Sequence, residues 1–177
     1  MDRPLLILDL DETLVFSTKK PLTCAHDFEC SDYFVYKRPG VDDFIATTAL
    51  HFDQAVWTSS TSDYASCIES GLFAQHPLVF LWSREKCTRR YDPELQEQYW
   101  VKDLKKVKRV GYELERTLFI DNTPKKLERN FGNIIAVRDF EGDQSDHELE
   151  ALARYLEIIV DEPNFRTIEK RGWRRAI

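Results

Sequence analysis

A run of four apolar residues, Leu5–Leu8, is followed directly by the acids Asp9 and Asp11. A short apolar run of this kind is typical of a strand buried in a parallel sheet, and ligands bind outside the carboxyl ends of such strands. Two acids held two residues apart repel each other unless a cation or a proton compensates them. The feature therefore predicts an α/β fold, with either a metal and phosphate site or a plain helix N-cap or turn at this point.

The chain has 177 residues, is 42% hydrophobic and 32% charged, and carries a net charge of −6. These values are those of a globular protein, and the length predicts one domain over residues 1–177. The negative net charge gives no sign of nucleic-acid binding. We interpret the basic stretches 102–109 and 166–175 as solvated surface, although a basic strip beside a site can favour an anionic substrate.

Membrane and secretory signals are not expected in this chain. No apolar stretch approaches the roughly 18 to 20 residues of a membrane span, and a strand is expected within a few residues of Met1. The four cysteines show no Cys-x-x-Cys spacing, which argues against zinc, and a disulfide framework is not needed at this length. We therefore expect reduced thiols and a cytoplasmic or nuclear protein that is not secreted.

Apolar runs of strand length alternate with amphipathic stretches along the chain. Buried strands are expected over residues 5–8, 54–57, 78–81, 118–120 and 134–137. Helices are expected over residues 41–50, 62–70 and 146–160. Gly71 is expected to end the second helix, and Ser145 with Glu148 matches a capping box before the third. The alternation predicts a Rossmann-like fold with a mostly parallel central sheet and helices on both faces.

Residues 17–37 interrupt this alternation. They show no helical period and contain the β-favouring run from Tyr33 to Tyr36, so we expect a small β-hairpin insertion after the first strand. An insertion of this length is too short to close off a site at the sheet edge. The stretch 84–103 has no clear period, and Asp92-Pro93 predicts a turn or loop within it.

Three more groups of polar residues follow predicted strands or apolar runs. Thr58 and Ser59 come after the second strand, Lys102 after an aromatic run, and Asp121 with Asn122 after another buried strand. Each group alone also has a structural reading, as a helix cap, a surface lysine or a turn. Their joint order predicts that they meet at one edge of the sheet.

These residue types suit phosphoryl transfer. A carboxylate can accept a phosphoryl group, and a second one can protonate the leaving oxygen and then deprotonate water. Magnesium keeps several waters, so one or two carboxylates are enough to hold it. A hydroxyl and an ammonium can then bind the remaining phosphoryl oxygens.

Five motifs carry a resemblance to a known family. They are Asp-Leu-Asp-Glu-Thr-Leu-Val at 9–15, Lys-Arg-Pro-Gly at 37–40, Trp-Thr-Ser-Ser at 57–60, Val-Lys-Asp-Leu at 101–104 and Asp-Asn-Thr-Pro at 121–124. Together they resemble the haloacid dehalogenase (HAD) superfamily. Within it they resemble the FCP/SCP branch of small C-terminal-domain phosphatases, also called NLI-interacting-factor-like. The resemblance extends from about Leu5 to at least Leu156 and implies the HAD core fold.

The resemblance also implies a role for each matching residue. Asp9 matches the nucleophile that becomes aspartyl-phosphate and a Mg²⁺ ligand. Asp11 matches the general acid and base, with its backbone carbonyl on the metal. Asp121 matches the remaining carboxylate ligand, so Asp9, Asp11 and Asp121 form the implied metal set.

Phosphate binding is implied for Thr58 with its neighbour Ser59, for Lys102, and for Asn122. Lys102 also matches the lysine that stabilises the phosphorylated intermediate, which makes it a catalytic candidate with Asp9 and Asp11. In the human-type members of this branch a longer insertion forms a hairpin with a hydrophobic pocket that selects a proline near the phosphoserine. The aromatic residues here either line such a pocket or pack the hairpin; they are Phe28, Tyr33, Phe34 and Tyr36.

The leading hypothesis is a monomeric, Mg²⁺-dependent protein serine/threonine phosphatase. Its substrate would be phosphoserine or phosphothreonine in an extended peptide, such as an RNA polymerase C-terminal-domain-like tail. Small phosphorylated metabolites or nucleic-acid terminal phosphates are the alternative substrates. A catalytically silent binding protein of the same fold is a further alternative, against which Asp9, Asp11 and Asp121 are all present.

Overall fold

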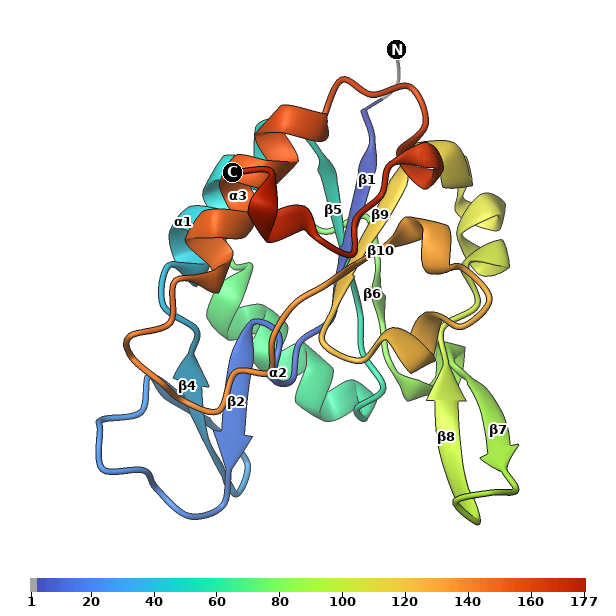
Figure 1. Ribbon diagram of the computed structural model, residues 1–177. Coiled ribbons are helices and arrows are strands. Elements are labelled where there is room, and N and C mark those ends of the chain that lie inside the picture. Colours follow the sequence, from blue (N-terminus) through green and yellow to red (C-terminus); the bar gives the residue numbers. More distant parts are fainter. Residues whose placement is uncertain (1–2) are drawn as a thin grey trace.

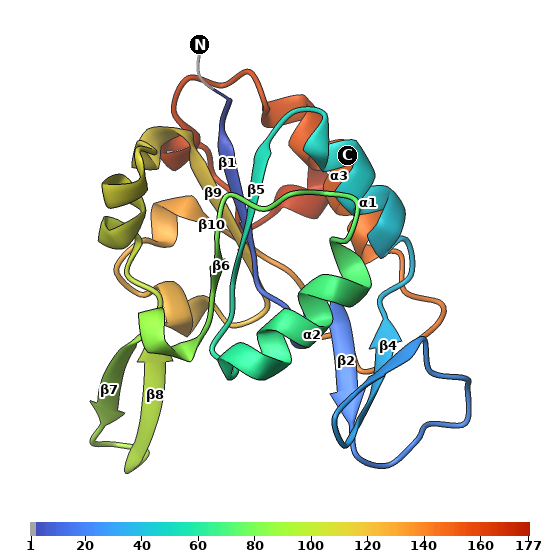
Figure 2. The ribbon, with the colours of Figure 1, turned by 180° about the vertical axis from the view of Figure 1, so that it is seen from behind.

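A five-stranded parallel sheet forms the centre of the computed structural model, which describes residues 3–177 (Figures 1 and 2). The strand order is β10-β9-β1-β5-β6. Their bounds are β1 (Leu5–Leu8), β5 (Asp53–Trp57), β6 (Leu81–Trp82), β9 (Thr117–Asp121) and β10 (Ile134–Ala136). The predicted parallel sheet is confirmed. The strand expected over 78–81 begins before the observed strand β6. The N–H of Val79 already donates to the carbonyl of Gln54, but regular pairing with β5 starts only at Leu81.

The three α-helices all pack against one face of this sheet. They are α1 (Val41–Ala49), α2 (Ser62–Leu72) and α3 (Glu148–Ile159). Leu6, Leu8 and Val56 point into the core that these helices cover. On the opposite face, Leu5 and Ile7 are covered by the short 3₁₀ helices at residues 104–110 and 124–127. Helices therefore lie on both faces, which explains why the strands read as continuous apolar runs.

The insertion after β1 is a three-stranded antiparallel sheet, not a two-stranded hairpin. Its strands are β2 (Val15–Thr18), β3 (Phe28–Cys30) and β4 (Tyr33–Lys37), in the order β2-β4-β3. Cys30 forms a disulfide with Cys67 on α2, with a Cα–Cα distance of 5.9 Å. The expectation of reduced thiols is therefore wrong for this pair, because folding brings the insertion against α2.

A second antiparallel hairpin occupies the stretch that showed no clear period. It consists of β7 (Thr88–Asp92) and β8 (Glu97–Val101). The turn predicted at Asp92 is confirmed, since its carboxylate accepts hydrogen bonds from the N–H groups of Glu94 and Leu95. In Figure 1 the insertion and this hairpin extend below the carboxyl ends of the central strands, one on each side.

Two predictions about helix ends are wrong. Helix α2 continues through Gly71, where a Cβ atom would lie 2.6 Å from the ring of Phe28. This glycine therefore permits a close approach of the insertion and does not stop the helix. The predicted capping box before α3 does not form either. Ser145 bonds to Asp143, while the Glu148 carboxylate accepts a hydrogen bond from the N–H of Arg138.

The basic C-terminal stretch is anchored to the body of the protein through Trp173, while Arg166, Arg171 and Arg175 stay exposed, as expected for solvated surface. Trp173 is 1% exposed, and its indole N–H donates to the carbonyl of Ala136 at 2.9 Å. Arg174 forms an ion pair with Glu148 of α3. Within residues 3–177, no helix has the length and apolar character needed to cross a membrane.

Candidate active site

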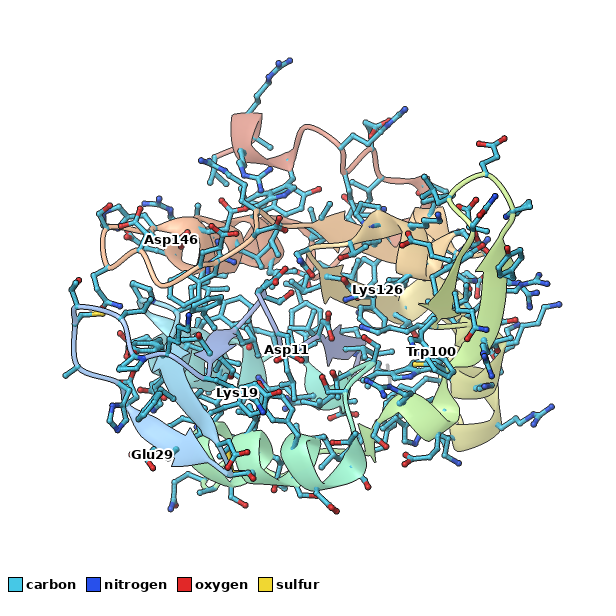
Figure 3. The ribbon with its side chains drawn as sticks, turned by 90° about the horizontal axis from the view of Figure 1, so that it is seen from below. Asp11, Lys19, Glu29, Trp100, Lys126 and Asp146 are labelled. Carbon is cyan, nitrogen blue, oxygen red and sulfur yellow. A yellow bond between two sulfur atoms is a disulfide. The ribbon has the colours of Figure 1, made fainter. Side chains whose placement is uncertain are left out.

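Strands β1, β5 and β9 end at the same edge of the sheet, which Figure 3 shows from below. Leu8 of β1 pairs with Val56 on one side and Ile120 on the other. The next residue, Asp9, donates its backbone N–H to the carbonyl of Ile120 at 2.9 Å. This register places Asp9 beside Asp121, the last residue of β9, as the order of the motifs predicted.

Asp9 and Asp121 share one ammonium group. The Nζ atom of Lys102 lies 2.9 Å from Oδ1 of Asp9 and 2.6 Å from Oδ2 of Asp121. All three side chains are buried, and Lys102 is completely so. Its Nζ atom also lies 4.9 Å from the centre of the Phe119 ring. The two carboxylates are thus close enough to bind a single cation.

A second lysine, Lys126, reaches the same two carboxylates. Its Nζ atom lies 2.9 Å from Oδ2 of Asp9 and 3.5 Å from Oδ1 of Asp121. The Lys126 carbonyl also accepts a hydrogen bond of 2.7 Å from the N–H of Lys102. Sequence reasoning missed this residue, because a lysine in the polar stretch after Pro124 looks like ordinary surface.

The charges around Asp9 favour its ionised form. Burial alone would raise the pKa of Asp9, but the ammonium groups of Lys102 and Lys126 outweigh it and lower that pKa. Burial and the neighbouring Asp9 charge together raise the pKa of Asp121. Burial opposes the charge of Lys126, yet Asp9 and Asp121 hold its pKa above the ordinary value. Asp9 is therefore the carboxylate of the pair that is poised to act as a nucleophile.

Asp11 has a different environment from Asp9. Ser60 donates a hydrogen bond of 2.7 Å to its Oδ2 atom, and Tyr64 donates one of 2.5 Å to its Oδ1 atom. Burial, together with the charge of Asp9, raises the pKa of Asp11 despite these two hydrogen bonds. A carboxyl group with a raised pKa suits general acid and base chemistry. Neither Ser60 nor Tyr64 was among the predicted site residues.

The motif after β5 presents a hydroxyl at the same edge. Thr58 is 1% exposed, and its Oγ1 atom accepts a hydrogen bond of 3.0 Å from the N–H of Ser60. An oxygen that accepts a hydrogen bond here keeps its own proton available for donation. Ser59 contributes its backbone carbonyl, which accepts a 2.7 Å hydrogen bond from Nε of Arg84.

Asn122 directly follows β9. Its amide donates to Glu12 at 3.1 Å and to Asp139 at 2.9 Å, and its Oδ1 atom accepts from Thr13 at 3.4 Å. These contacts tie the loop after β9 to the loop after β1. The hydrogen bonds of Asn122 therefore support the backbone around the site, and a direct phosphate contact stays a prediction.

A pocket of about 230 Å³ opens beside Asp11. It is lined by Asp11, Ser17, Tyr33, Ser60, Thr61, Tyr64 and Arg84. Of the four predicted aromatic residues, Tyr33 alone belongs to this lining. Phe28 packs on Gly71, the ring of Phe34 lies 5.0 Å from that of His26, and buried Tyr36 accepts a hydrogen bond from Leu22.

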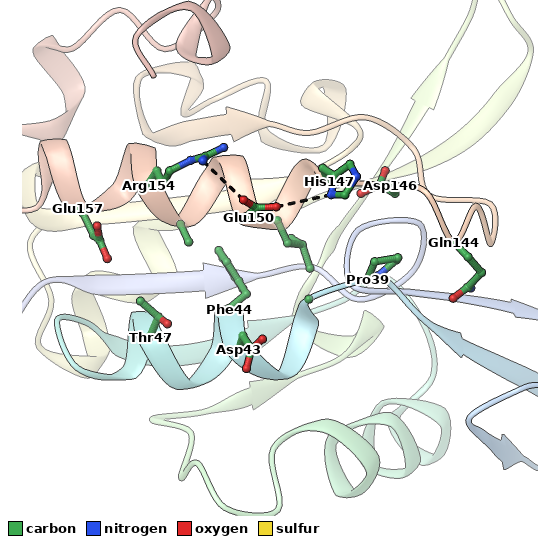
Figure 4. A pocket seen from close by; sticks show the side chains of 13 residues that line it. Pro39, Asp43, Phe44, Thr47, Gln144, Asp146, His147, Glu150, Arg154 and Glu157 are labelled. Atoms are coloured by element: carbon green, nitrogen blue, oxygen red, sulfur yellow. Dashed lines mark ion pairs between the residues drawn. The ribbon is translucent and has the colours of Figure 1, made fainter.

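A larger pocket of about 460 Å³ lies between α1 and α3 (Figure 4). Phe44 of α1 lines it, and Glu150 pairs with Arg154 across one turn of α3. Its lining includes neither Asp9 nor Asp121. We therefore place the chemistry at the carboxyl edge of the sheet and not in this pocket, despite its size.

The donor set at the sheet edge fits a magnesium ion. No group of three or more His, Cys, Asp or Glu side chains within residues 3–177 is arranged to hold a metal. Magnesium, however, needs only one or two carboxylates and keeps several waters. Asp9 and Asp121 supply two, and the Oδ1 atom of Asp9 is buried with no hydrogen bond, although it lies in ion-pair contact with Lys102.

Comparison with known proteins identifies the family of this chain. The NLI interacting factor-like phosphatase family matches residues 4–166, which include every residue of the site described above. The chain belongs to this family. The resemblance to the HAD superfamily and its FCP/SCP branch, noted from the five motifs, is thereby confirmed.

Curated relatives of this chain are about 30% identical to it. A probable C-terminal domain small phosphatase of Dictyostelium discoideum is 31% identical over 170 residues, covering 92% of this chain and 53% of the relative. The human carboxy-terminal domain RNA polymerase II polypeptide A small phosphatase 1 is 30% identical over 163 residues, covering 88% and 59%. The chain thus spans somewhat more than half the length of these two relatives.

Two solved structures show the same fold as this chain. Fcp1, described as an essential RNA polymerase II CTD phosphatase, superimposes with a TM-score of 0.65 at 17% identity, covering 89% of this chain and 62% of that chain. A fission yeast Fcp1 variant bound to beryllium fluoride gives a TM-score of 0.57 at 17% identity, covering 92% and 53%. At such low identity these likenesses show the fold alone.

Proposed function

We propose that this chain is a Mg²⁺-dependent phosphatase that hydrolyses phosphomonoesters through an aspartyl-phosphate on Asp9. The observation that carries the proposal is the contact of Asp9 and Asp121 with a single ammonium, that of Lys102, at 2.9 and 2.6 Å. A carboxylate nucleophile, a second carboxylate and a buried cation are the parts that phosphoryl transfer needs. Membership of the NLI interacting factor-like phosphatase family supports this chemistry.

The first displacement uses Asp9 and Asp11. A carboxylate oxygen of Asp9 attacks phosphorus, the P–O bond to the leaving group breaks, and the leaving oxygen takes a proton from Asp11. In the second displacement, water attacks the same phosphorus and gives a proton to Asp11, while the P–O bond to Asp9 breaks. The raised pKa of Asp11 suits this exchange, because its carboxyl must both give and accept a proton.

The remaining residues hold the phosphoryl oxygens and the metal. Lys102 places a buried positive charge beside the nucleophile, and the O–H of Thr58 is available to donate to a phosphoryl oxygen. Asp9, Asp121 and the backbone carbonyl of Asp11 would hold Mg²⁺, which when bound supplies further positive charge to the transferring group. Asn122 supports the loops that carry these groups through its hydrogen bonds to Glu12 and Asp139.

An extended phosphopeptide is the substrate class that we propose. The pocket beside Asp11 is lined by the hydroxyls of Ser17, Tyr33 and Thr61 together with Arg84, which suits a polar peptide backbone next to the phosphorylated residue. The short insertion folds to one side of the strand ends, as Figure 1 shows. The human relative is named for action on the C-terminal domain of RNA polymerase II. A tail of that chemical kind, phosphorylated on serine or threonine, is therefore the favoured substrate.

Phosphate release from an aryl phosphate, with and without Mg²⁺, tests the chemistry. We expect Mg²⁺-dependent turnover that is lost in Asp9→Asn and kept in Asp42→Asn, which changes an acid paired with Lys37 on the exposed start of α1. Turnover that survives Asp9→Asn, or no turnover in the parent protein, would overturn the proposal.

A second experiment tests which class of substrate the protein prefers. Values of kcat/KM should be measured on phosphoserine peptides, phosphorylated metabolites and oligonucleotides with a 3′-phosphate. We expect the highest value for the peptides. A clear preference for either of the other two would replace the peptide assignment while leaving the phosphatase chemistry in place.

A further inference from the structure

Lys126 bridges the two carboxylates that the proposed function assigns to the metal. Its Nζ atom lies 2.9 Å from Oδ2 of Asp9 and 3.5 Å from Oδ1 of Asp121. Lys102 contacts the other oxygen of each carboxylate. Each acid therefore has one oxygen facing Lys102 and the other facing Lys126, so that the two ammonium groups lie on different sides of the pair.

This arrangement neutralises the pair of acids. Two carboxylates carry two negative charges, and the two ammonium groups carry two positive charges. A divalent cation that approaches both acids is attracted by them but repelled by both lysines. If the Lys126 ammonium left, one net negative charge would remain at the two acids and Lys102, and the Oδ2 atom of Asp9 would be free to bind a metal.

The side chain of Lys126 can move away from the two acids, whereas that of Lys102 is held in place. The side chain of Lys102 is 0% exposed and lies against the ring of Phe119, whereas that of Lys126 is 21% exposed. Lys126 follows Pro124 in a short 3₁₀ helix, Pro124–Leu127, at the surface of the sheet edge. Because its carbonyl is fixed by the N–H of Lys102, the backbone can stay in place while the long side chain swings toward solvent.

We propose that Lys126 is a built-in competitor for Mg²⁺, which holds Asp9 and Asp121 together before the metal binds and is displaced by it. Lys126 thereby sets the Mg²⁺ concentration at which the site is filled. The identity of the metal rests on the proposed function. The competition rests on the distances from Lys126 to Asp9 and Asp121. It assigns no catalytic step to Lys126.

Calorimetric titration of the full chain with MgCl₂, without substrate, measures the competition directly. Lys126→Gln removes the charge and keeps most of the side-chain length. We expect its Kd for Mg²⁺ to fall by about tenfold or more, since a unit positive charge is removed at ion-pair distance from a largely buried site. Lys126→Arg keeps the charge and should stay near the parent value. The matched control is Lys125→Gln, which changes the neighbouring lysine that pairs with Asp92 and should leave the Kd unchanged.

The parent protein allows a second measurement that needs no substitution. Acetylation of each lysine by acetic anhydride is followed by mass spectrometry at increasing Mg²⁺. We expect Lys126 to become several-fold more reactive as the metal binds, because its ammonium is released to solvent, while Lys102 stays protected. This readout remains valid if Lys126→Gln does not fold.

The outcomes separate this inference from the proposed function. Equal Kd values for the parent and Lys126→Gln, or unchanged acetylation of Lys126 on metal binding, would overturn the competition and leave the Mg²⁺ site intact. Weaker binding by Lys126→Gln would also overturn it, since Lys126 would then assist the metal. If neither the parent nor any variant binds Mg²⁺, the metal assignment itself is wrong, and the inference falls with it.

Discussion

Tyr64, on the first turn of α2, donates a hydrogen bond of 2.5 Å to Asp11, which follows β1 and lies 53 residues earlier in the chain. The same carboxylate accepts a second hydrogen bond of 2.7 Å from Ser60. Each donor holds a different oxygen, so together they fix the plane of the carboxyl group. The helix that follows β5 thereby orients Asp11, the residue proposed as general acid and base, in the loop after β1.

Tyr64→Phe should reduce kcat on a phosphopeptide by about tenfold, part of the 10² to 10⁴ that a positioned acid or base contributes. Ser60→Ala should have a similar effect. Because both donors hold one carboxylate, the double variant should lose less than the product of the two single losses. Steady-state measurement of kcat for the parent, the two single variants and the double variant tests this expectation. Ser70→Ala, which removes an exposed hydroxyl later on the same helix, serves as a control and should leave kcat unchanged. Independent, multiplicative losses would contradict a shared positioning role.

Arg38, just after the insertion, forms a largely buried ion pair with Asp146 in the loop before α3. The Arg38 side chain is fully buried, donates to both oxygens of Asp146 at 2.9 and 2.8 Å, and donates to two backbone carbonyls. Asp146→Asn should lower the free energy of unfolding at neutral pH by about 3 kcal/mol, because it leaves a buried guanidinium without its counter-charge. Urea denaturation measures the loss. A change below about 0.5 kcal/mol, the range of ordinary surface substitutions, would contradict it.

The same pair predicts a pH dependence of stability. Burial alone would raise the pKa of Asp146, but hydrogen bonds from Arg38 and from the N–H of Glu148 outweigh it and lower that pKa below its ordinary value of 3.8. A lowered folded-state pKa contributes stability above pH 3.8 and loses it as the pH falls through the folded value. The stability difference between the parent and Asp146→Asn should therefore shrink as the pH is lowered below that point. A constant difference over the same range would contradict the assignment.

The disulfide between Cys30 and Cys67 ties the insertion to α2 across 37 residues of chain. Replacing both cysteines by serine should lower the free energy of unfolding by about 2 to 4 kcal/mol, as expected when a cross-link of this kind is lost. Thermal unfolding with and without dithiothreitol measures the effect in the parent protein. Cys24→Ser changes a free cysteine and should leave the free energy of unfolding and the effect of dithiothreitol unchanged. Four reactive thiols in the unreduced, denatured chain would show that the bond does not form.

Gly71 and Phe28 form a close contact between α2 and β3. Alanine is normally a better helix residue than glycine, but a Cβ atom here would lie 2.6 Å from the Phe28 ring. Gly71→Ala should therefore destabilise the protein by about 1 to 3 kcal/mol, the usual effect of overpacking. In a Phe28→Leu background the same substitution should cost much less. Equal effects in both backgrounds, measured by urea denaturation, would contradict the contact.

The strands and helices were predictable because burial on both faces leaves a continuous apolar signal. Residues 5–8 coincide with β1, and the predicted helix 41–50 differs from α1 (Val41–Ala49) by one residue. Strands β7 and β8 gave no such signal, because half of their side chains are exposed and many are charged. Strand β3 is only three residues long and has a glutamate at its centre, so its pairing depends on the tertiary structure. The single domain over 1–177 and the monomeric state stay predictions.

The candidate site was predictable to the extent that its residues follow strands. Asp9, Thr58 and Asp121 were found because each stands directly after, or at the end of, an apolar run. Lys126 and Tyr64 were not, since each lies in a polar helical segment and reaches the site only through the folded chain path. The N–H of Lys102 that bonds to the carbonyl of Lys126 is the contact that brings the second lysine to the acids.

Trapping the phosphorylated enzyme tests the central claim most directly. The protein is mixed with a radiolabelled phosphopeptide and Mg²⁺, quenched within milliseconds, reduced with borohydride and digested for mass spectrometry. Our account predicts that the label is covalently bound and that position 9 alone is converted to homoserine, with no such product in Asp9→Asn. Phosphate release that proceeds without a labelled protein, or reduction at any acid other than Asp9, would contradict it.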